Sequence, residues 1–329
     1  MSWPTWGLRL RTCCASFDVA APALCNVAVT NSCNATCDFC NFANGKVERK
    51  DLRWIDADQF DAALQILHDR GVRYVSFFGG EPLLHPRLSD MIAMSVTKGM
   101  GPALITNGWL LSSKLDQLAS AGLKTVYVSI DAPSMSDHEK NRGLKGLGER
   151  IRKATSRMPM LGMTALAQVT MSKLIDDYRA LVPLLQQLGF EAVAFSYPQR
   201  TRLGSSSLAW SAESNLMKFT DSELVQAFEA VDNLRNAFPV NNPRASIADM
   251  KRRAGTLRLL RRLQEFLYGL EFRCMALRCL GRTHVLGLGV CEYSARARRL
   301  HGMHSRLLPR PQRDASFCGV AWRCIGPLK

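Results

Sequence analysis

Two alternating patterns of apolar and polar residues run along the chain from residue 24 to residue 238. Short apolar runs, typical of strands buried on both faces of a parallel sheet, cover Leu24–Thr30, Arg73–Phe78, Ala103–Thr106, Lys124–Ile130, Thr164–Thr170 and Glu191–Tyr197. Amphipathic stretches with helical spacing cover Ala57–Arg70, Arg87–Lys98, Ser113–Ala121, Leu147–Arg157, Ile175–Leu188 and Asp221–Phe238. This alternation predicts an α/β fold of six βα units, arranged as an open or partial (β/α)6 TIM-like barrel.

Glycine marks the predicted ends of four helices. Gly71, Gly99, Gly122 and Gly189 each lie just past a helical stretch. Glycine is common after the last helical residue because it adopts the left-handed conformation at little cost. We therefore expect each of these helices to end there, shortly before the next strand.

The length of 329 residues suits one large domain with an appendage. The pattern predicts a lead segment over residues 1–23, a core barrel over 24–238 and a C-terminal extension over 239–329 that is poorly defined by its sequence. The net charge of +15 is concentrated in the tail, because residues 251–329 hold 17 Lys and Arg against 4 Asp and Glu. Residues 1–250 hold 26 against 24, so the predicted barrel is almost neutral and nucleic acid is not its expected partner.

Other compositional features narrow the class of protein. No apolar run reaches the roughly 18 residues of a membrane span, and Pro4, Arg9 and Arg11 interrupt any signal peptide at the N-terminus. Eleven cysteines without a secretion signal favour metal chemistry in a reducing compartment over disulfides. We therefore expect a cytoplasmic protein without a membrane partner.

Three of the cysteines form a compact motif. Cys33, Cys37 and Cys40 have the spacing C-x3-C-x2-C, directly after the first predicted strand. Iron–sulfur clusters are normally held by four Cys thiolates, so a loop of three can hold three irons of a [4Fe–4S] cluster and leave the fourth open to an external ligand. A zinc site or a redox sensor is the alternative, although structural zinc usually takes four ligands and no nearby Cys or His completes such a set.

Further polar residues follow the next strands. Gly79-Gly80-Glu81-Pro82 comes after the second strand, where paired glycines let a backbone approach a ligand closely and the carboxylate can accept from an ammonium group. Asn107 ends the third strand, while Ser129 and Asp131 end the fourth. The alternatives are a plain turn for the glycine segment and helix N-caps for the others.

Three sites are weaker candidates for ligand contacts. Gln168 and Thr170 lie at the end of the fifth strand, and the long polar segment 197–207 follows the sixth. At that position the segment is expected to face a substrate.

In identity, order and spacing, these motifs resemble the radical S-adenosylmethionine (radical SAM) superfamily over roughly residues 24–253. The run Phe78–Pro86 matches the loop of that family which binds the amino group of SAM, and Arg142-Gly143 matches its loop after the fourth strand. The resemblance implies a [4Fe–4S] cluster on Cys33, Cys37 and Cys40. It also implies SAM held by Gly79, Gly80, Glu81, Pro82, Asn107, Ser129 and Asp131.

Within the superfamily the general resemblance is to the MoaA-like and the peptide-modifying SPASM enzymes. It implies reductive cleavage of SAM to methionine and a 5′-deoxyadenosyl radical, a small-molecule or peptide substrate, and an electron donor such as flavodoxin or ferredoxin. No residue is assigned as catalytic. A different interpretation is a non-catalytic iron–sulfur or zinc sensor whose basic tail contacts nucleic acid.

The tail departs from the SPASM pattern. Residues 251–329 are rich in Arg, Leu and Cys and lack the aromatic strand pair that the resemblance leads one to expect. One hypothesis is a basic tail that contacts RNA or phospholipid. The other, which we favour, is a shifted reading frame: with permitted codons, residues 261–280 read one base later alternate aromatic and polar residues, and the codons of Met275 and Ala276 are then forced to encode Trp. On that hypothesis the tail cysteines, Cys274, Cys279, Cys291, Cys318 and Cys324, hold no cluster.

Overall fold

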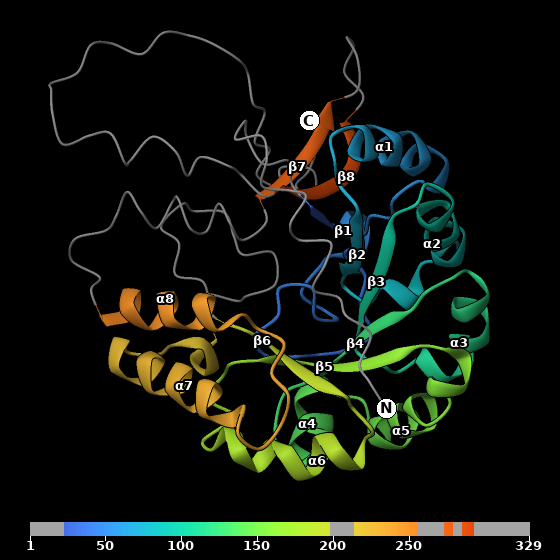
Figure 1. Ribbon diagram of the computed structural model, residues 1–329. Coiled ribbons are helices and arrows are strands. Elements are labelled where there is room, and N and C mark those ends of the chain that lie inside the picture. The colour runs from blue at the N-terminus through green and yellow to red at the C-terminus, as the bar shows by residue number, and fades with distance from the viewer. Residues whose placement is uncertain (1–22, 198–213, 256–272, 279–284, 293–329) are drawn as a thin grey trace, which may run out of the picture.

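The computed structural model describes residues 23–197, 214–255, 273–278 and 285–292 (Figure 1). Six parallel strands lie side by side in chain order: β1 (Leu24–Thr30), β2 (Tyr74–Gly79), β3 (Gly101–Thr106), β4 (Thr125–Ile130), β5 (Thr164–Thr170) and β6 (Ala192–Ser196). The helices between them are α1 (Ala57–Asp69), α2 (Leu88–Thr97), α3 (Leu111–Ser120), α4 (Met135–Arg142), α5 (Leu147–Thr155) and α6 (Leu181–Gln187). The predicted α/β class, with six parallel strands and alternating helices, is confirmed.

The two faces of the sheet differ in burial. On β4, Val126, Val128 and Ile130 are fully buried, whereas the alternate residues Tyr127 and Ser129 are only partly buried. Successive side chains of a strand point to opposite faces, and Figure 1 shows the helices around the outside of the curved sheet. The main hydrophobic core therefore lies between the sheet and its outer helices, and the inner face of the partial barrel carries the less buried residues.

The predicted helix ends agree with the backbone. Gly71, Gly99, Gly122 and Gly189 all have positive φ, between 72° and 91°. An L-residue with a side chain rarely adopts this conformation. These four positions end helices for the reason inferred from the sequence.

Two helices were not predicted. Helix α4 occupies a segment that the sequence analysis treated as a loop, and α8 (Arg244–Gly255) lies in the predicted extension, where it packs against α7 (Asp221–Leu234). Helix α4 has no apolar stripe and buries only His138 and Arg142. Periodicity analysis depends on such a stripe, which explains the wrong prediction for this segment.

The sheet continues beyond both of its predicted edges. Val193 of β6 exchanges backbone hydrogen bonds of 2.9 and 2.7 Å with Pro239 and Asn241. At the other edge, an antiparallel hairpin of β7 (Arg273–Arg278) and β8 (Val285–Glu292) pairs with β1, giving the order β6-β5-β4-β3-β2-β1-β8-β7. The predicted extension therefore contributes backbone pairing to the barrel sheet.

Some predictions concern residues outside the described part of the chain. They include the lead segment up to residue 22, residues 198–207 of the polar segment, and the tail cysteines Cys279, Cys318 and Cys324. No helix in the described ranges has the length and apolar character needed to cross a membrane.

Candidate functional site

The cysteine loop leaves the sheet at the end of β1 and returns beside it. Asn31 closes the base of this loop: its side-chain amide donates to the carbonyl of Asp51 at 2.8 Å and accepts from the amide of Arg53 at 2.7 Å. The hydroxyl of Thr30 also donates to the carbonyl of Arg53 at 2.8 Å. These bonds hold both ends of the loop at the carboxyl edge of β1, so that Cys33, Cys37 and Cys40 lie at this edge.

Gly79 and Gly80 bring the end of β2 against the start of the same loop. The amide of Gly80 donates to the carbonyl of Thr30 at 2.8 Å, and the amide of Glu81 donates to the carbonyl of Ser32 at 2.7 Å. A Cβ atom would stand 2.2 Å from the Thr30 carbonyl oxygen at Gly79 and 2.0 Å from that of Ser32 at Gly80. Both positions require glycine because the neighbouring strand end is too close for a side chain.

The carboxylate of Glu81 ties β2 to β3 inside the protein. It is fully buried and accepts hydrogen bonds from the hydroxyl of Thr106 at 2.6 Å, from the amide of Asn107 at 2.7 Å and from the amide of Leu83 at 3.0 Å. Burial raises the pKa of Glu81, and these hydrogen bonds partly oppose the shift. A carboxylate offers about four acceptor positions, so the three bonds leave room for about one more donor.

Asn107 extends this connection to the cysteine loop. Its side-chain amide donates to Asn34 Oδ1 at 2.8 Å, and its own Oδ1 accepts from the amide of Trp109 at 2.9 Å. Asn34 directly follows Cys33 in the chain. The ends of β2 and β3 therefore both contact the segment that carries the first cysteine.

A second contact to the loop comes from the buried pair Asp131–Arg142. Arg142 Nη2 donates to Asp131 Oδ1 at 2.6 Å, and Asn141 Nδ2 donates to Asp131 Oδ2 at 2.9 Å. His138 Nδ1 accepts from the amide of Asp131 at 3.2 Å and lies 3.6 Å from its carboxylate. Burial opposes ionisation of Asp131, but the charge and hydrogen bond of Arg142, together with the adjacent ring of His138, outweigh it and hold the pKa of Asp131 well below its usual range.

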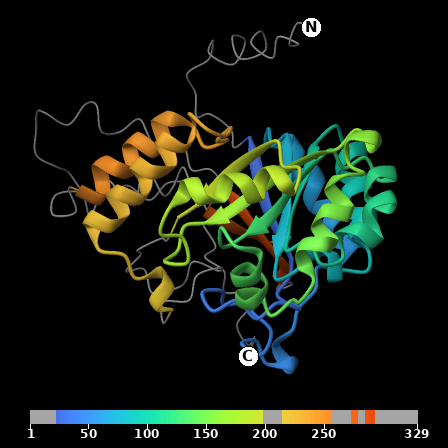
Figure 2. The ribbon, with the colours of Figure 1, turned by 90° about the horizontal axis from the view of Figure 1, so that it is seen from below.

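The C-terminal end of α4 contacts the cysteine loop, and Figure 2 shows α4, in green, beside the blue segment that follows β1. The carbonyl of Arg142 accepts from the amide of Thr36 at 2.9 Å, and Asn141 Oδ1 accepts from the amide of Asp38 at 3.4 Å. Gly143 has a φ of 64° and lies so close to Thr36 that a Cβ would meet the Thr36 hydroxyl at 2.3 Å. Helix α4 therefore holds the two residues that flank Cys37.

The three thiols are enclosed and none is in a disulfide. Cys37 is only 5% exposed, and burial raises the pKa values of Cys33 and Cys37 to about 12 and also raises that of Cys40. The positive charge of Arg142 acts on all three in the opposite direction. Within the described ranges, no three His, Cys, Asp or Glu side chains converge as a single metal ion would require.

The remaining polar candidates lie on the inner face of the sheet. Ser129 is partly buried and lies opposite Gln168 of β5 in the strand register. Gln168 Nε2 in turn donates to the hydroxyl of Ser196 on β6 at 2.6 Å. The strand ends from β4 to β6 thus present a row of polar side chains, on the face opposite the hydrophobic core.

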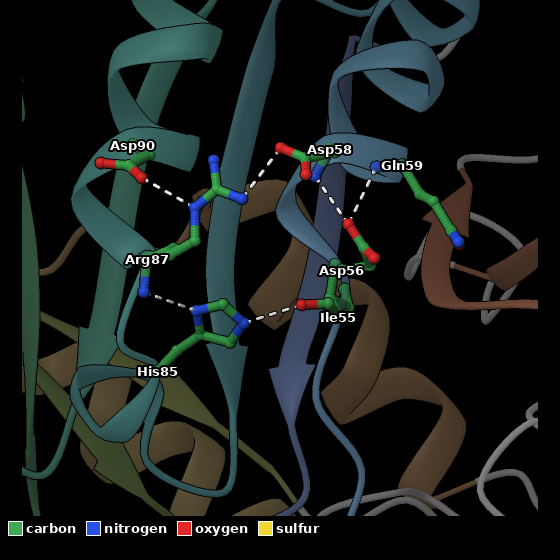
Figure 3. A network of polar contacts seen from close by, with 7 residues as sticks. All are labelled: Ile55, Asp56, Asp58, Gln59, His85, Arg87 and Asp90. Atoms are coloured by element: carbon green, nitrogen blue, oxygen red, sulfur yellow. Dashed lines mark hydrogen bonds and ion pairs between the residues drawn. The ribbon is translucent and has the colours of Figure 1, made fainter.

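The segment after Glu81 continues into a polar network that supports the barrel wall (Figure 3). Pro82 begins a single 3₁₀ turn, and the buried ring of His85 then lies between the carbonyl of Ile55 at 2.8 Å and the amide of Arg87 at 3.2 Å. Burial lowers the pKa of His85, which favours a neutral ring that donates from Nε2 and accepts at Nδ1. His85, in the run Phe78–Pro86, therefore connects the residues just before α1 to those just before α2.

Among the residues predicted for the site, the structure joins Gly80, Glu81 and Asn107 by hydrogen bonds to the segment that carries Cys33, and Gly79 packs against Thr30 in the same segment. Ser129 lies on the neighbouring inner face, and Asp131 reaches the cysteine loop through α4. A contact from Glu81 or Asp131 to SAM stays a prediction, and the bonds above show what else these carboxylates hold.

Sequence reasoning did not single out Asn34, Thr36, Thr106 or Asn141, and it left His138 out. Their partners lie 7 to 106 residues away along the chain, and only the Arg142-Gly143 pair gave a signal in the sequence.

Comparison with known proteins agrees with this geometry. The family model for the radical SAM superfamily matches residues 27–178, which run from β1 through β5 and include the cysteine loop, Gly79–Pro82 and Arg142. A GTP 3′,8-cyclase of Chlorobaculum tepidum is 34% identical over 136 residues, covering 40% of this chain and 39% of that protein. The corresponding enzyme of Staphylococcus aureus is 29% identical over 170 residues, covering 49% and 48%.

The chain spans less than half the length of these curated relatives. The crystal structure of Streptococcus suis SuiB bound to S-adenosylmethionine superposes with a TM-score of 0.52 at 17% identity, covering 68% of this chain and 50% of that one. At this identity the superposition shows the fold alone. The cysteine motif and the family match identify residues 27–178 as a radical SAM domain, in agreement with the resemblance seen in the sequence.

Proposed function

We propose that this protein is a radical SAM enzyme that cleaves S-adenosylmethionine reductively and starts radical chemistry on a small-molecule or peptide substrate. In this proposal Cys33, Cys37 and Cys40 hold a [4Fe–4S] cluster. The segment Gly79–Pro82 binds SAM together with Asn107 and Ser129. Flavodoxin or ferredoxin is the proposed class of electron donor.

One observation carries the proposal: two strand ends and the end of a helix contact the same cysteine loop. The end of β2 reaches it through Gly80 and Glu81, the end of β3 through Asn107, and α4 reaches it through Arg142. Such a network fixes the loop at the carboxyl edge of the parallel strands, where (β/α) barrels place their chemistry.

The donor set fits a [4Fe–4S] cluster better than a single ion. Three free thiols share one short loop, and nothing in the described part of the chain gathers them on one point. A cubane cluster takes its thiolates at separate corners, so the ligands need not converge. When bound, the cluster supplies one electron to the sulfonium of SAM, and the protein supplies orientation and exclusion of solvent.

The residues of the chain divide this work. Gly79 and Gly80 permit the approach of β2 to the loop, while Glu81 and Asn107 hold β2 and β3 at a fixed distance from it. The partly buried Ser129 lies where the inner face of the barrel meets this edge. The hydrogen-bonded ends of β2 and β3 therefore support the cysteine loop, and the inner face of the barrel presents polar side chains beside it.

The test is anaerobic reconstitution with iron and sulfide, followed by incubation with dithionite and SAM. Formation of 5′-deoxyadenosine and methionine is the expected result. Unchanged SAM with an intact cluster would instead support the iron–sulfur sensor, and bound zinc without iron would support a zinc site. The variant Cys25→Ala is the matched control, because Cys25 is a buried cysteine of β1 outside the motif.

A further inference from the structure

Arg142 is unusual among the basic residues of this protein because it is buried. It is the only Lys or Arg classed as buried among the residues whose exposure the structure describes, and its side chain is 9% exposed. Burying a guanidinium is costly unless the charge is paired. The buried guanidinium of Arg142 therefore needs negatively charged or hydrogen-bond-accepting partners for its N–H groups.

Asp131 satisfies only part of the guanidinium. Nη2 donates to Asp131 Oδ1 at 2.6 Å, whereas Nε is buried and has no hydrogen-bond partner. An unsatisfied buried N–H donor typically costs about 1–3 kcal/mol. This free donor points to an acceptor that the polypeptide itself does not provide.

The cysteine loop lies next to Arg142 and carries sulfur atoms, which are hydrogen-bond acceptors. The main chain of Arg142 binds Thr36 between Cys33 and Cys37, and the neighbouring Asn141 binds Asp38 just after Cys37. These bonds place the Arg142 end of the ion pair beside the loop, whereas the Asp131 carboxylate accepts from the side chains of Arg142 and Asn141.

We propose that Arg142 is the internal counter-cation of the cluster, with its free Nε–H directed to a cluster or thiolate sulfur, and that it raises the cluster's reduction potential. The inference rests on the proposed function, because it presumes a cluster on Cys33, Cys37 and Cys40. Three thiolates leave the bound cluster with a net negative charge, and reduction adds one further electron. A buried cation stabilises the reduced form more than the oxidised one.

The test measures the reduction potential of the cluster in SAM-free, full-length protein, by electron paramagnetic resonance during titration with dithionite. Arg142→Gln should lower the equilibrium constant for one-electron reduction at least tenfold, which is 59 mV or more. Arg142→Lys should lie within about threefold of the parent, because it keeps the charge. Asp131→Asn should shift the potential in the opposite direction, because it removes a negative charge.

The opposite signs separate this role from a purely structural one, since loosening of the loop would move both single variants in the same direction. The double variant Asp131→Asn, Arg142→Gln should lie between them and avoids an unpaired buried charge. Arg157→Gln is the matched control, because Arg157 also bonds an aspartate, Asp116, at 2.6 Å but on the surface. Its potential should equal that of the parent.

Several results would overturn the inference. They are an unchanged potential in Arg142→Gln, a shift of the same sign in both single variants, or equal loss of iron from folded Arg142→Gln and Arg142→Lys. Loss of iron from the Gln variant alone would support it, because charge then decides retention of the cluster. A parent protein that holds no cluster would contradict the proposed function itself, and so is distinguishable from these results.

Discussion

The backbone amide of Thr36 donates a hydrogen bond of 2.9 Å to the carbonyl of Arg142, 106 residues further along the chain. Thr36 lies inside the cysteine motif and Arg142 is the last residue of α4. The position of Cys37 therefore depends on the fourth βα unit as well as on the strand that precedes it. This coupling suggests several experiments.

Gly143→Ala should destabilise the protein and reduce iron loading, because Gly143 has a positive φ and a Cβ would stand 2.3 Å from the Thr36 hydroxyl. We expect a loss of about 1–3 kcal/mol in the free energy of unfolding, measured by urea denaturation. Gly146→Ala is the control: its φ is also positive, at 79°, but nothing lies within 4 Å of the added Cβ.

The difference between the two glycine variants measures the contact with the cysteine loop. Adding Thr36→Ala to Gly143→Ala should recover part of that difference, because it removes the clashing hydroxyl from an exposed residue. Equal losses in Gly143→Ala and Gly146→Ala would mean that α4 does not constrain the loop.

The triple variant Cys33→Ala, Cys37→Ala, Cys40→Ala should lose the broad visible absorbance of the reconstituted protein and all cleavage of SAM. Thiolates are the ligands of iron–sulfur clusters, and Ala offers none. Iron content and the visible spectrum are the measurements. An unaltered iron content would place the cluster elsewhere in the chain.

Replacing Glu81 should affect both stability and SAM binding. Glu81→Ala leaves the donors of Thr106, Asn107 and Leu83 without their acceptor, which should cost at least about 2 kcal/mol in the free energy of unfolding. If Glu81 also accepts from the ammonium group of SAM, a charged hydrogen bond of roughly 1.5–3 kcal/mol predicts about a ten- to hundredfold loss of affinity.

Calorimetric titration of folded Glu81→Ala with SAM separates the two effects of this substitution. Thr106→Val is the control, because it breaks one of the same hydrogen bonds without removing the carboxylate. Equal SAM affinity in parent and Glu81→Ala would remove Glu81 from the SAM site and leave it a structural role.

The Asp131–Arg142 pair should make stability depend on pH in acid. The pKa of Asp131 is lower in the folded protein than in the unfolded chain, because Arg142 and His138 outweigh the effect of burial. The unfolded state therefore binds a proton first as the pH falls. This contribution to stability is present above the ordinary Asp pKa of about 3.9 and is lost as the pH falls through the folded value.

Asp131→Asn should lower the free energy of unfolding at pH 7 by about 3–5 kcal/mol, as expected when one partner of a buried ion pair is removed. The difference from the parent should shrink below about pH 4, which guanidinium denaturation at several pH values would measure. The surface variant Asp116→Asn should lose no more than about 1 kcal/mol. A difference for Asp131→Asn that stays constant down to pH 2 would argue against an ionised Asp131.

The sequence allowed the strands, most helices and the cysteine motif to be predicted, because each depends on residues close in the chain. The short apolar run Lys124–Ile130 indicated β4, and Gly71 and Gly122 indicated helix ends by their conformational freedom. Helix α4 was not predicted in this way, because it buries a charged and a polar side chain and has no apolar stripe.

The role of each polar residue depended on partners far away in the chain. Glu81 reads in the sequence as a free carboxylate for an ammonium group, yet folding gives it Thr106 and Asn107 as partners. Asp131 reads as a helix cap, yet folding pairs it with Arg142 inside the protein.

The sequence by itself determined the local elements and the three thiols, since hydrophobic period, glycine conformation and ligand spacing are properties of neighbouring residues. Only the tertiary structure decided which side chains surround those thiols. Parallel strands bring their carboxyl ends to one edge, so Gly80, Asn107 and Arg142 meet the cysteine loop from three different units. The physical reason is that burial and electrostatic pairing act between atoms close in space, whatever their separation along the chain.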